Sequence, residues 1–223
     1  MLRRMFTTIL ALALLATPSD AQAAKCKKLR HALVLLRDDE PGRALECLEE
    51  LKNRPRIDLG NLHYLRGQAF WEQGERAKAV SAFQLAIRER ERQRYKDDRI
   101  TVNPSWFAIL GQAHYDARAL PEAVEAFGKA GRDTVLTRPD WVAMYAEALY
   151  ESSNASSAWT VLQWGAERYP NHPELLRRRA WVALETGRPV QALEAATKLA
   201  EVAPDAITDE DRSVFEAAQQ AAP

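Results

Sequence analysis

The side chains of this chain that could do chemistry are four histidines, two cysteines and a group of serines. The histidines lack the HExxH spacing of a zinc site, and the cysteines form no CxxC pair; the histidines are His31, His63, His114 and His172. The serines at 152–153 and 156–157 fall in a predicted turn, where they serve as turn and cap residues. The sequence therefore predicts no catalytic residue, no metal site, no cofactor and no enzymatic activity.

Charge gives no overall preference for a polyanionic partner. The chain has 31 basic and 31 acidic residues, so its formal net charge is zero. Two basic stretches, 88–99 and 177–179, are interleaved with acids or face them, and neither forms a one-sided stripe with stacking aromatics. We therefore expect no nucleic-acid binding.

The N-terminus has the three parts of a secretory signal peptide. Arg3 and Arg4 precede an uncharged apolar run at 6–16, and Ala21-Gln22-Ala23 supplies a small-x-small cleavage site. Residues 1–23 are the predicted signal peptide. An uncleaved anchor is the alternative, although a bilayer span needs about 20 apolar residues. We expect an exported bacterial protein, periplasmic or secreted, with no integral membrane segment after cleavage.

Small residues recur in pairs along the rest of the chain. The spacing inside each pair is constant, and the pairs follow one another at a nearly constant interval, with one longer step between the second and the third; they are Ala32/Ala44, Gly67/Ala79, Gly111/Ala123, Ala146/Ala158 and Ala180/Ala192. A small residue on each of two antiparallel helices lets the backbones approach closely. Five such contacts predict a stacked array of helical hairpins.

The breakers between the helices fit the same period when the small residues are numbered positions 8 and 20 of each unit. Gly74 and Gly187 fall at position 15, where a helix stops in the left-handed conformation. Pro41, Pro121 and Pro189 fall in the first turn of the second helix, where proline is tolerated. Positions 20, 24 and 27 are mostly apolar, which is the spacing of an amphipathic helix.

This pattern resembles the tetratricopeptide repeat (TPR) family. The second unit, YLRGQAFWEQGERAKAVSAFQLAI, matches the small, aromatic and glycine positions of that family, and the third, FAILGQAHYDARALPEAVEAFGKA, matches well. The resemblance covers about 25–206 and implies an all-α, right-handed superhelical array of five antiparallel helix pairs. We expect the array to occupy 24–223, with repeats at about 25–58, 60–93, 104–137, 139–172 and 173–206.

Two departures from the regular period carry information. The long interval between the second and third units comes from RERERQRYKDDRITVN, whose alternating charges suggest that the second helix runs on into solvent. A last helix at about 208–221 would cap the array, because Thr208 can serve as its N-cap and acids follow in its first turn.

Cys26 and Cys47 form a possible disulfide. An oxidising compartment permits it, and the pairing of small residues places the two cysteines on neighbouring helices with a small offset along the helix axis. Two separate thiols remain the alternative. A bridge would stabilise the first unit by roughly 3 kcal/mol.

The TPR resemblance also implies a binding groove, because the first helix of each unit lines the concave face of such arrays. The residues at the lining positions form an aromatic track beside a line of acids, and this groove favours a protein or peptide partner, which can be basic. Repeat packing is the alternative role of the same side chains. The predicted groove residues are Tyr64, Trp71, Glu72, Tyr115, Asp116, Glu147, Tyr150, Glu151, Trp181 and Glu185.

The sequence therefore predicts a non-catalytic adaptor or scaffold of the bacterial cell envelope that holds a segment of a partner in its groove. One alternative is a self-associating assembly module, which would use exposed apolar residues of the first unit such as Leu33 and Leu36. Another is an accessory subunit of a cell-wall enzyme, which rests on fold analogy alone.

Overall fold

The computed structural model describes residues 26–97 and 99–222, and the predicted signal peptide at 1–23 lies outside them. Every regular element within the described residues is helical, which confirms the predicted all-α class. The helices are α1 (Leu29–Arg37), α2 (Pro41–Leu51), α3 (Leu59–Glu72), α4 (Arg76–Lys96), α5 (Pro104–Asp116), α6 (Leu120–Ala130), α7 (Arg132–Val135), α8 (Pro139–Glu151), α9 (Ala155–Arg168), α10 (Pro173–Glu185), α11 (Pro189–Val202) and α12 (Asp209–Ala221), with a 3-10 helix η1 (Pro204–Ala206) before α12.

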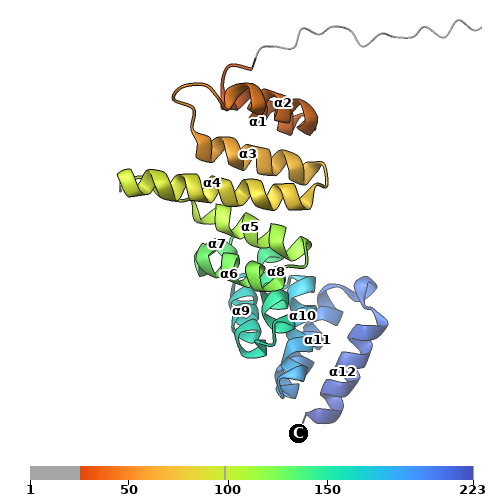
Figure 1. Cartoon of the computed structure of the whole chain (residues 1–223). Coiled ribbons are helices and arrows are strands. Elements are labelled where there is room, and N and C mark those ends of the chain that lie inside the picture. Colours follow the sequence, from red (N-terminus) through yellow and green to blue (C-terminus); the bar gives the residue numbers. More distant parts are fainter. Residues whose placement is uncertain (1–25, 98, 223) are drawn as a thin grey trace, which may run out of the picture.

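Five antiparallel helix pairs stack into an elongated array, with α12 added at the C-terminal end (Figure 1). The pairs are α1/α2, α3/α4, α5/α6, α8/α9 and α10/α11, and we number them as units 1 to 5. All ten predicted small residues are buried at the contacts within these pairs. The fit is tight: a Cβ at Gly67 would lie 2.4 Å from the ring of Phe83, and one at Gly111 would lie 2.9 Å from Phe127.

The turn inside each pair has the same backbone conformation in all five units. Position 15 is left-handed whether or not it is glycine. Its φ is 76° at Gly74 and 70° at Gly187, and it is 59°, 58° and 62° at Asp39, Arg118 and Ser153. The geometry of the hairpin is therefore imposed by the array, and glycine only removes the steric cost of the left-handed residue.

The structure departs from the regular unit at two places. Helix α4 has 21 residues and projects past α3, as the alternating charges predict (Figure 1). Helix α6 ends early at Gly131, whose φ is 80°, and the chain forms the short helix α7. Val135 of α7 is buried, so this extra turn adds to the core. The break after α6 was not predicted.

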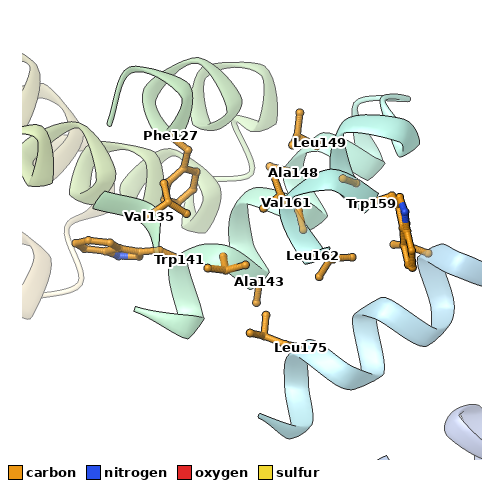
Figure 2. Close-up of a cluster of buried hydrophobic side chains, with 14 of the residues drawn as sticks. Phe127, Val135, Trp141, Ala143, Ala148, Leu149, Trp159, Val161, Leu162 and Leu175 are labelled. Atoms are coloured by element: carbon orange, nitrogen blue, oxygen red, sulfur yellow. The ribbon is translucent and has the colours of Figure 1, made fainter. Parts of the chain in front are cut away.

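The core is spread along the array. Its largest cluster joins α6, α8, α9 and α10 around Phe127, Trp141 and Leu162 (Figure 2). A smaller cluster joins α1 and α2 to α3 and includes Leu36, which is only 8% exposed. The expectation that Leu36 lies on the surface is therefore wrong: it belongs to the core of unit 1, whereas Leu33 is 47% exposed. No helix in the described part of the chain combines the length and apolar character that a bilayer crossing requires.

Helix α12 continues the repeat by one more half-unit. It packs on α10 and α11, with Val214 and Phe215 against a cluster of small residues, Ala180, Ala195 and Ala196. Thr208 is its N-cap, as predicted, and forms a capping box with Asp211. Val214 follows Ala180 by the same interval that separates the small pairs of units 4 and 5, so α12 stands where the first helix of a sixth unit would stand.

Candidate functional site

Two of the predicted groove acids are paired with arginines of neighbouring units. Glu147 of α8 forms an ion pair with Arg178 of α10, and Glu151 lies 2.7 Å from Arg118 in the turn of unit 3. Only 16% of the Glu147 side chain is exposed. The predicted line of acids is therefore interrupted by cations at this point, and the ion pairs link units 3, 4 and 5.

Aromatic side chains lie around Glu147. Burial, the hydrogen bond that its hydroxyl donates to Glu147 and the charge of that carboxylate raise the pKa of Tyr115. Tyr150, on the same helix as Glu147, packs against Trp181 of α10 with ring centroids 4.2 Å apart. We call Tyr115, Glu147, Tyr150, Trp181 and Arg178 the groove cluster. It gathers four predicted groove residues into one patch.

A cavity of about 450 Å³ opens beside the groove cluster, between α10, α11 and α12. We call it the C-terminal cavity. Trp181, Leu199 and Phe215 belong to its apolar wall, and six acidic and three basic side chains surround that wall; they are Glu147, Glu151, Glu174, Glu210, Asp211, Glu216, Arg177, Arg178 and Arg212. Nine of the seventeen residues that line the cavity are charged, so an apolar wall lies inside a strongly charged rim.

One side of the cavity depends on an ion pair between α10 and α12. Arg177 donates from Nε to Asp211 at 2.8 Å, and Asp211 also accepts from the backbone N–H of Thr208 at 2.9 Å. Burial alone would raise the pKa of Asp211, but the hydrogen bonds from Arg177 and Thr208 outweigh it and hold the pKa below its ordinary value. Asp211 is therefore charged at neutral pH and fixes the first turn of α12.

The two predicted groove aromatics of unit 2 lie in contacts between helices. Tyr64 stacks on Trp106 of α5, with centroids 5.0 Å apart and planes 11° apart, and its pKa is raised by burial. Trp71 lies under the guanidinium of Arg76 at 4.1 Å. These aromatics take part in the packing of units 2 and 3, which is the alternative role that the sequence left open.

Of the remaining predicted acids, Glu185 at the end of α10 accepts a hydrogen bond from the hydroxyl of Tyr150 in the groove cluster. Glu72 and Asp116 lie on the surface at the ends of α3 and α5. The pKa of Glu72 is raised by partial burial and by the charge of Asp39. Partial burial also raises the pKa of Asp116, against the opposing effect of Arg76. Neither of these two acids joins the groove cluster.

One of the four histidines packs between two helices. His114 is 7% exposed on α5, 3.5 Å from the side-chain amide of Gln84, and burial lowers its pKa. Within residues 26–97 and 99–222, no three His, Cys, Asp or Glu side chains come together as a group that could hold a metal ion. The two cysteines are joined as a disulfide, Cys26–Cys47, with a Cα separation of 5.2 Å, and both are buried.

The sequence reasoning missed Phe215 and the arginines that pair with the groove acids. A signal for Phe215 was present, because Trp181 and Phe215 are one repeat interval apart, as are Arg177 and Asp211. Extending the period one step beyond the fifth unit would have placed these residues on one face. The partners of Glu147 and Glu151 depend on how units stack, which the pattern within one unit does not contain.

Comparison with known proteins identifies the fold. No protein-family model matches the chain, and no curated protein sequence does. The crystal structure of YrrB, described as a TPR protein with an unusual peptide-binding site, superposes with a TM-score of 0.68 at 16% identity, over 86% of this chain and 90% of that one. MamA from Desulfovibrio magneticus RS-1 superposes with a TM-score of 0.67 at 15% identity, over 83% and 98% of the two chains. These likenesses show a TPR-type fold.

Proposed function

We propose that this TPR-fold chain is a non-catalytic scaffold of the bacterial cell envelope, which holds a segment of a partner protein across the groove cluster and the C-terminal cavity. The observation that carries the proposal is the cavity itself, where Trp181 and Phe215 form an apolar wall inside a rim of six acids and three arginines. Aromatic side chains are the usual anchors of a protein interface, and a charged rim selects the partner.

The chemistry of the site favours a partner segment with one apolar side chain flanked by lysine or arginine. The apolar side chain would enter the cavity between Trp181 and Phe215. Glu210 and Glu216 lie on the exposed rim and belong to no ion pair within the described residues, so they are open to a cation from the partner. The groove cluster continues the apolar surface toward unit 3. The description of YrrB as a peptide-binding TPR protein agrees with this use of the fold.

Site-specific crosslinking tests the binding proposal. A photo-reactive phenylalanine analogue replaces Ala200, which lines the cavity and is exposed, and the control carries it at Gln163, exposed on α9. We expect a defined partner to crosslink from position 200 and not from position 163. The crosslink should disappear in Glu210→Lys/Glu216→Lys and persist in Glu122→Lys/Asp133→Lys, which changes the net charge equally on α6 and α7. A crosslink that survives the first double variant would contradict the proposal.

The envelope location rests on the predicted signal peptide and needs a separate test. The full chain, expressed in a bacterium with its own N-terminus, should be recovered from the periplasm or the medium with Ala24 as its first residue, as measured by intact mass. Replacing Leu12 and Leu14 by arginine should interrupt the apolar run and retain the protein in the cytoplasm. A protein that keeps residues 1–23 and stays in the cytoplasm would contradict export.

A further inference from the structure

The free end of α4 presents an aromatic side chain in a basic setting. Arg90 ties the helix to the rest of the array: it lies 2.8 Å from Asp58 and 5.5 Å from the ring of Trp106. Residues 91–96 continue past α3 into solvent (Figure 1). We call them the α4 overhang. Tyr95 near its tip is 94% exposed, whereas the other large exposed apolar residues range from 37% to 53%.

The cations near Tyr95 are available to a partner. Arg92 pairs with Glu89, and Arg99 pairs with Asp97. Arg94 and Lys96, which flank Tyr95, have no ion pair among the residues that the structure describes. The overhang is thus an aromatic anchor between two cations, which is the complement of an apolar cavity with an acidic rim.

The C-terminal cavity has that complementary chemistry. Its wall of Trp181, Leu199 and Phe215 can take an aromatic ring, and acids outnumber arginines around it by six to three. Glu210 and Glu216, which form no ion pair within the described residues, can pair with Arg94 and Lys96 of the overhang. The α4 overhang and the cavity lie far apart along the array, so one chain cannot bring its own overhang to its own cavity (Figure 1).

We propose that the cavity also binds a second copy of this chain, which inserts Tyr95 into the C-terminal cavity and sets Arg94 and Lys96 against Glu210 and Glu216. The inference rests on the cavity being a docking site, as the proposed function requires. The contact is head-to-tail, so each copy keeps one free overhang or one free cavity and can bind a further copy. An interface made by one helix end is small, and its affinity is weak and salt-dependent.

The test is the concentration dependence of mass for the mature chain, measured by analytical ultracentrifugation up to about 1 mM at low and high salt. We expect reversible association at low salt that weakens at high salt. Tyr95→Ser should weaken it about 30-fold or more, the usual effect of removing a central aromatic anchor, and Tyr95→Phe should retain it. Val190→Ser, at another exposed apolar residue, is the matched control and should leave the association unchanged.

Mixing two variants tests the head-to-tail arrangement. The donor-defective chain carries Tyr95→Ser with Arg94→Glu and Lys96→Glu, and the acceptor-defective chain carries Glu210→Lys and Glu216→Lys. All five positions are exposed, so the fold should be kept, and circular dichroism checks it. Each variant alone should be monomeric. Their mixture should form dimers and nothing larger, because it contains one intact overhang surface and one intact cavity.

Three results would overturn the inference: a wild-type chain that is monomeric throughout, a Tyr95→Ser chain that associates like wild type, or a mixture that stays monomeric. The crosslinking test separates this inference from the proposed function. A wild-type chain that crosslinks an envelope partner from position 200 but never self-associates would remove only the self-association. A chain that self-associates but crosslinks no partner would remove only the proposed function.

Discussion

The two ends of the array are closed in different ways. At the N-terminal end, unit 1 has a nine-residue first helix, and the disulfide between Cys26 and Cys47 ties the segment before that helix to α2. At the C-terminal end, α12 continues the register of the repeats and is held by the Arg177–Asp211 ion pair and a capping box. A solenoid end has neighbours on one side only, so each end needs its own closure.

The difference shows how local composition decides the kind of closure. Unit 1 leaves Leu33 and Val34 half exposed, and its turn holds Asp39 where units 2 and 5 have glycine. Its first helix, α1, buries only Ala32 and Leu36, and the disulfide adds a covalent link at this end. The C-terminal end buries Ala218 and covers Ala195 with α12, and charged groups complete the contact. The stability of unit 1 should therefore fall when the disulfide is removed, and the docking of α12 should weaken when the charge of its ion pair is removed.

The largest effect should come from removing the disulfide. Replacing both Cys26 and Cys47 by serine should lower the local stability of unit 1 by about 3 kcal/mol, because a closed loop of this length restricts the unfolded chain by that amount. Amide hydrogen exchange, followed by mass spectrometry, should speed up in α1 and α2 while α10 to α12 keep their rates. If exchange in unit 1 stayed unchanged, or accelerated equally in all helices, the claim that the disulfide stabilises the N-terminal end specifically would be wrong.

The matching change at the other end is Asp211→Ala. It removes the partner of Arg177 and one half of the capping box, and we expect a loss of about 2 kcal/mol in the docking of α12. Hydrogen exchange should accelerate in α12 and leave unit 1 unchanged. Asp209→Ala is the control, because Asp209 is on the exposed side of the same turn. If both substitutions had the same effect on exchange, the Arg177–Asp211 pair would make no specific contribution to the docking of α12.

Acid should separate the two ends without any mutation. The pKa of Asp211 is lower in the folded chain than in the unfolded chain, so the unfolded state binds the proton first. The stabilisation is complete above the ordinary aspartate pKa of about 3.9 and is lost as the pH falls through the folded value. Below about pH 4, the exchange protection of α12, taken relative to the intrinsic exchange rate at each pH, should therefore fall more than that of the disulfide-linked unit 1. The Asp211→Ala chain should lack this pH dependence of α12.

The regular part of the fold was predictable from the sequence because its causes are local. Gly67 and Gly111 indicate a close contact between helices because they have no side chain, and Pro41 and Pro189 indicate helix starts because proline fixes φ near the helical value. The break at Gly131 was not predictable in this way. A glycine near a helix end is common, and the burial of Val135 behind it depends on tertiary packing against unit 4.

The candidate site was predictable only in part. The resemblance identified Tyr115, Glu147, Tyr150 and Trp181 as groove residues, and they do lie together. It could not show that Arg178 of the next unit neutralises Glu147. Two other predicted groove residues, Tyr64 and Trp71 of unit 2, take part in packing instead: Tyr64 stacks on Trp106 of the next unit, and Trp71 lies under the guanidinium of Arg76. The outcome at each position depends on the neighbouring unit, which a pattern for one unit cannot describe.

The smallest prediction concerns the turns at the two ends. Gly187→Ala should cost unit 5 about 1 kcal/mol. The φ of Gly187 is 70° and nothing lies within 4 Å of an added Cβ, so the whole cost is backbone strain.

Asp39→Gly should stabilise unit 1 by about 0.5 kcal/mol, because glycine removes the steric cost of the left-handed conformation at this position. The gain is small because aspartate tolerates the left-handed region better than alanine does, and because glycine loses more chain entropy on folding. Hydrogen exchange in the two units measures both changes. If the stability gain from Asp39→Gly exceeded the loss from Gly187→Ala, strain in the first turn would be a main reason that unit 1 needs its disulfide. We expect the gain to be the smaller of the two, so the disulfide instead compensates for the few residues that α1 buries.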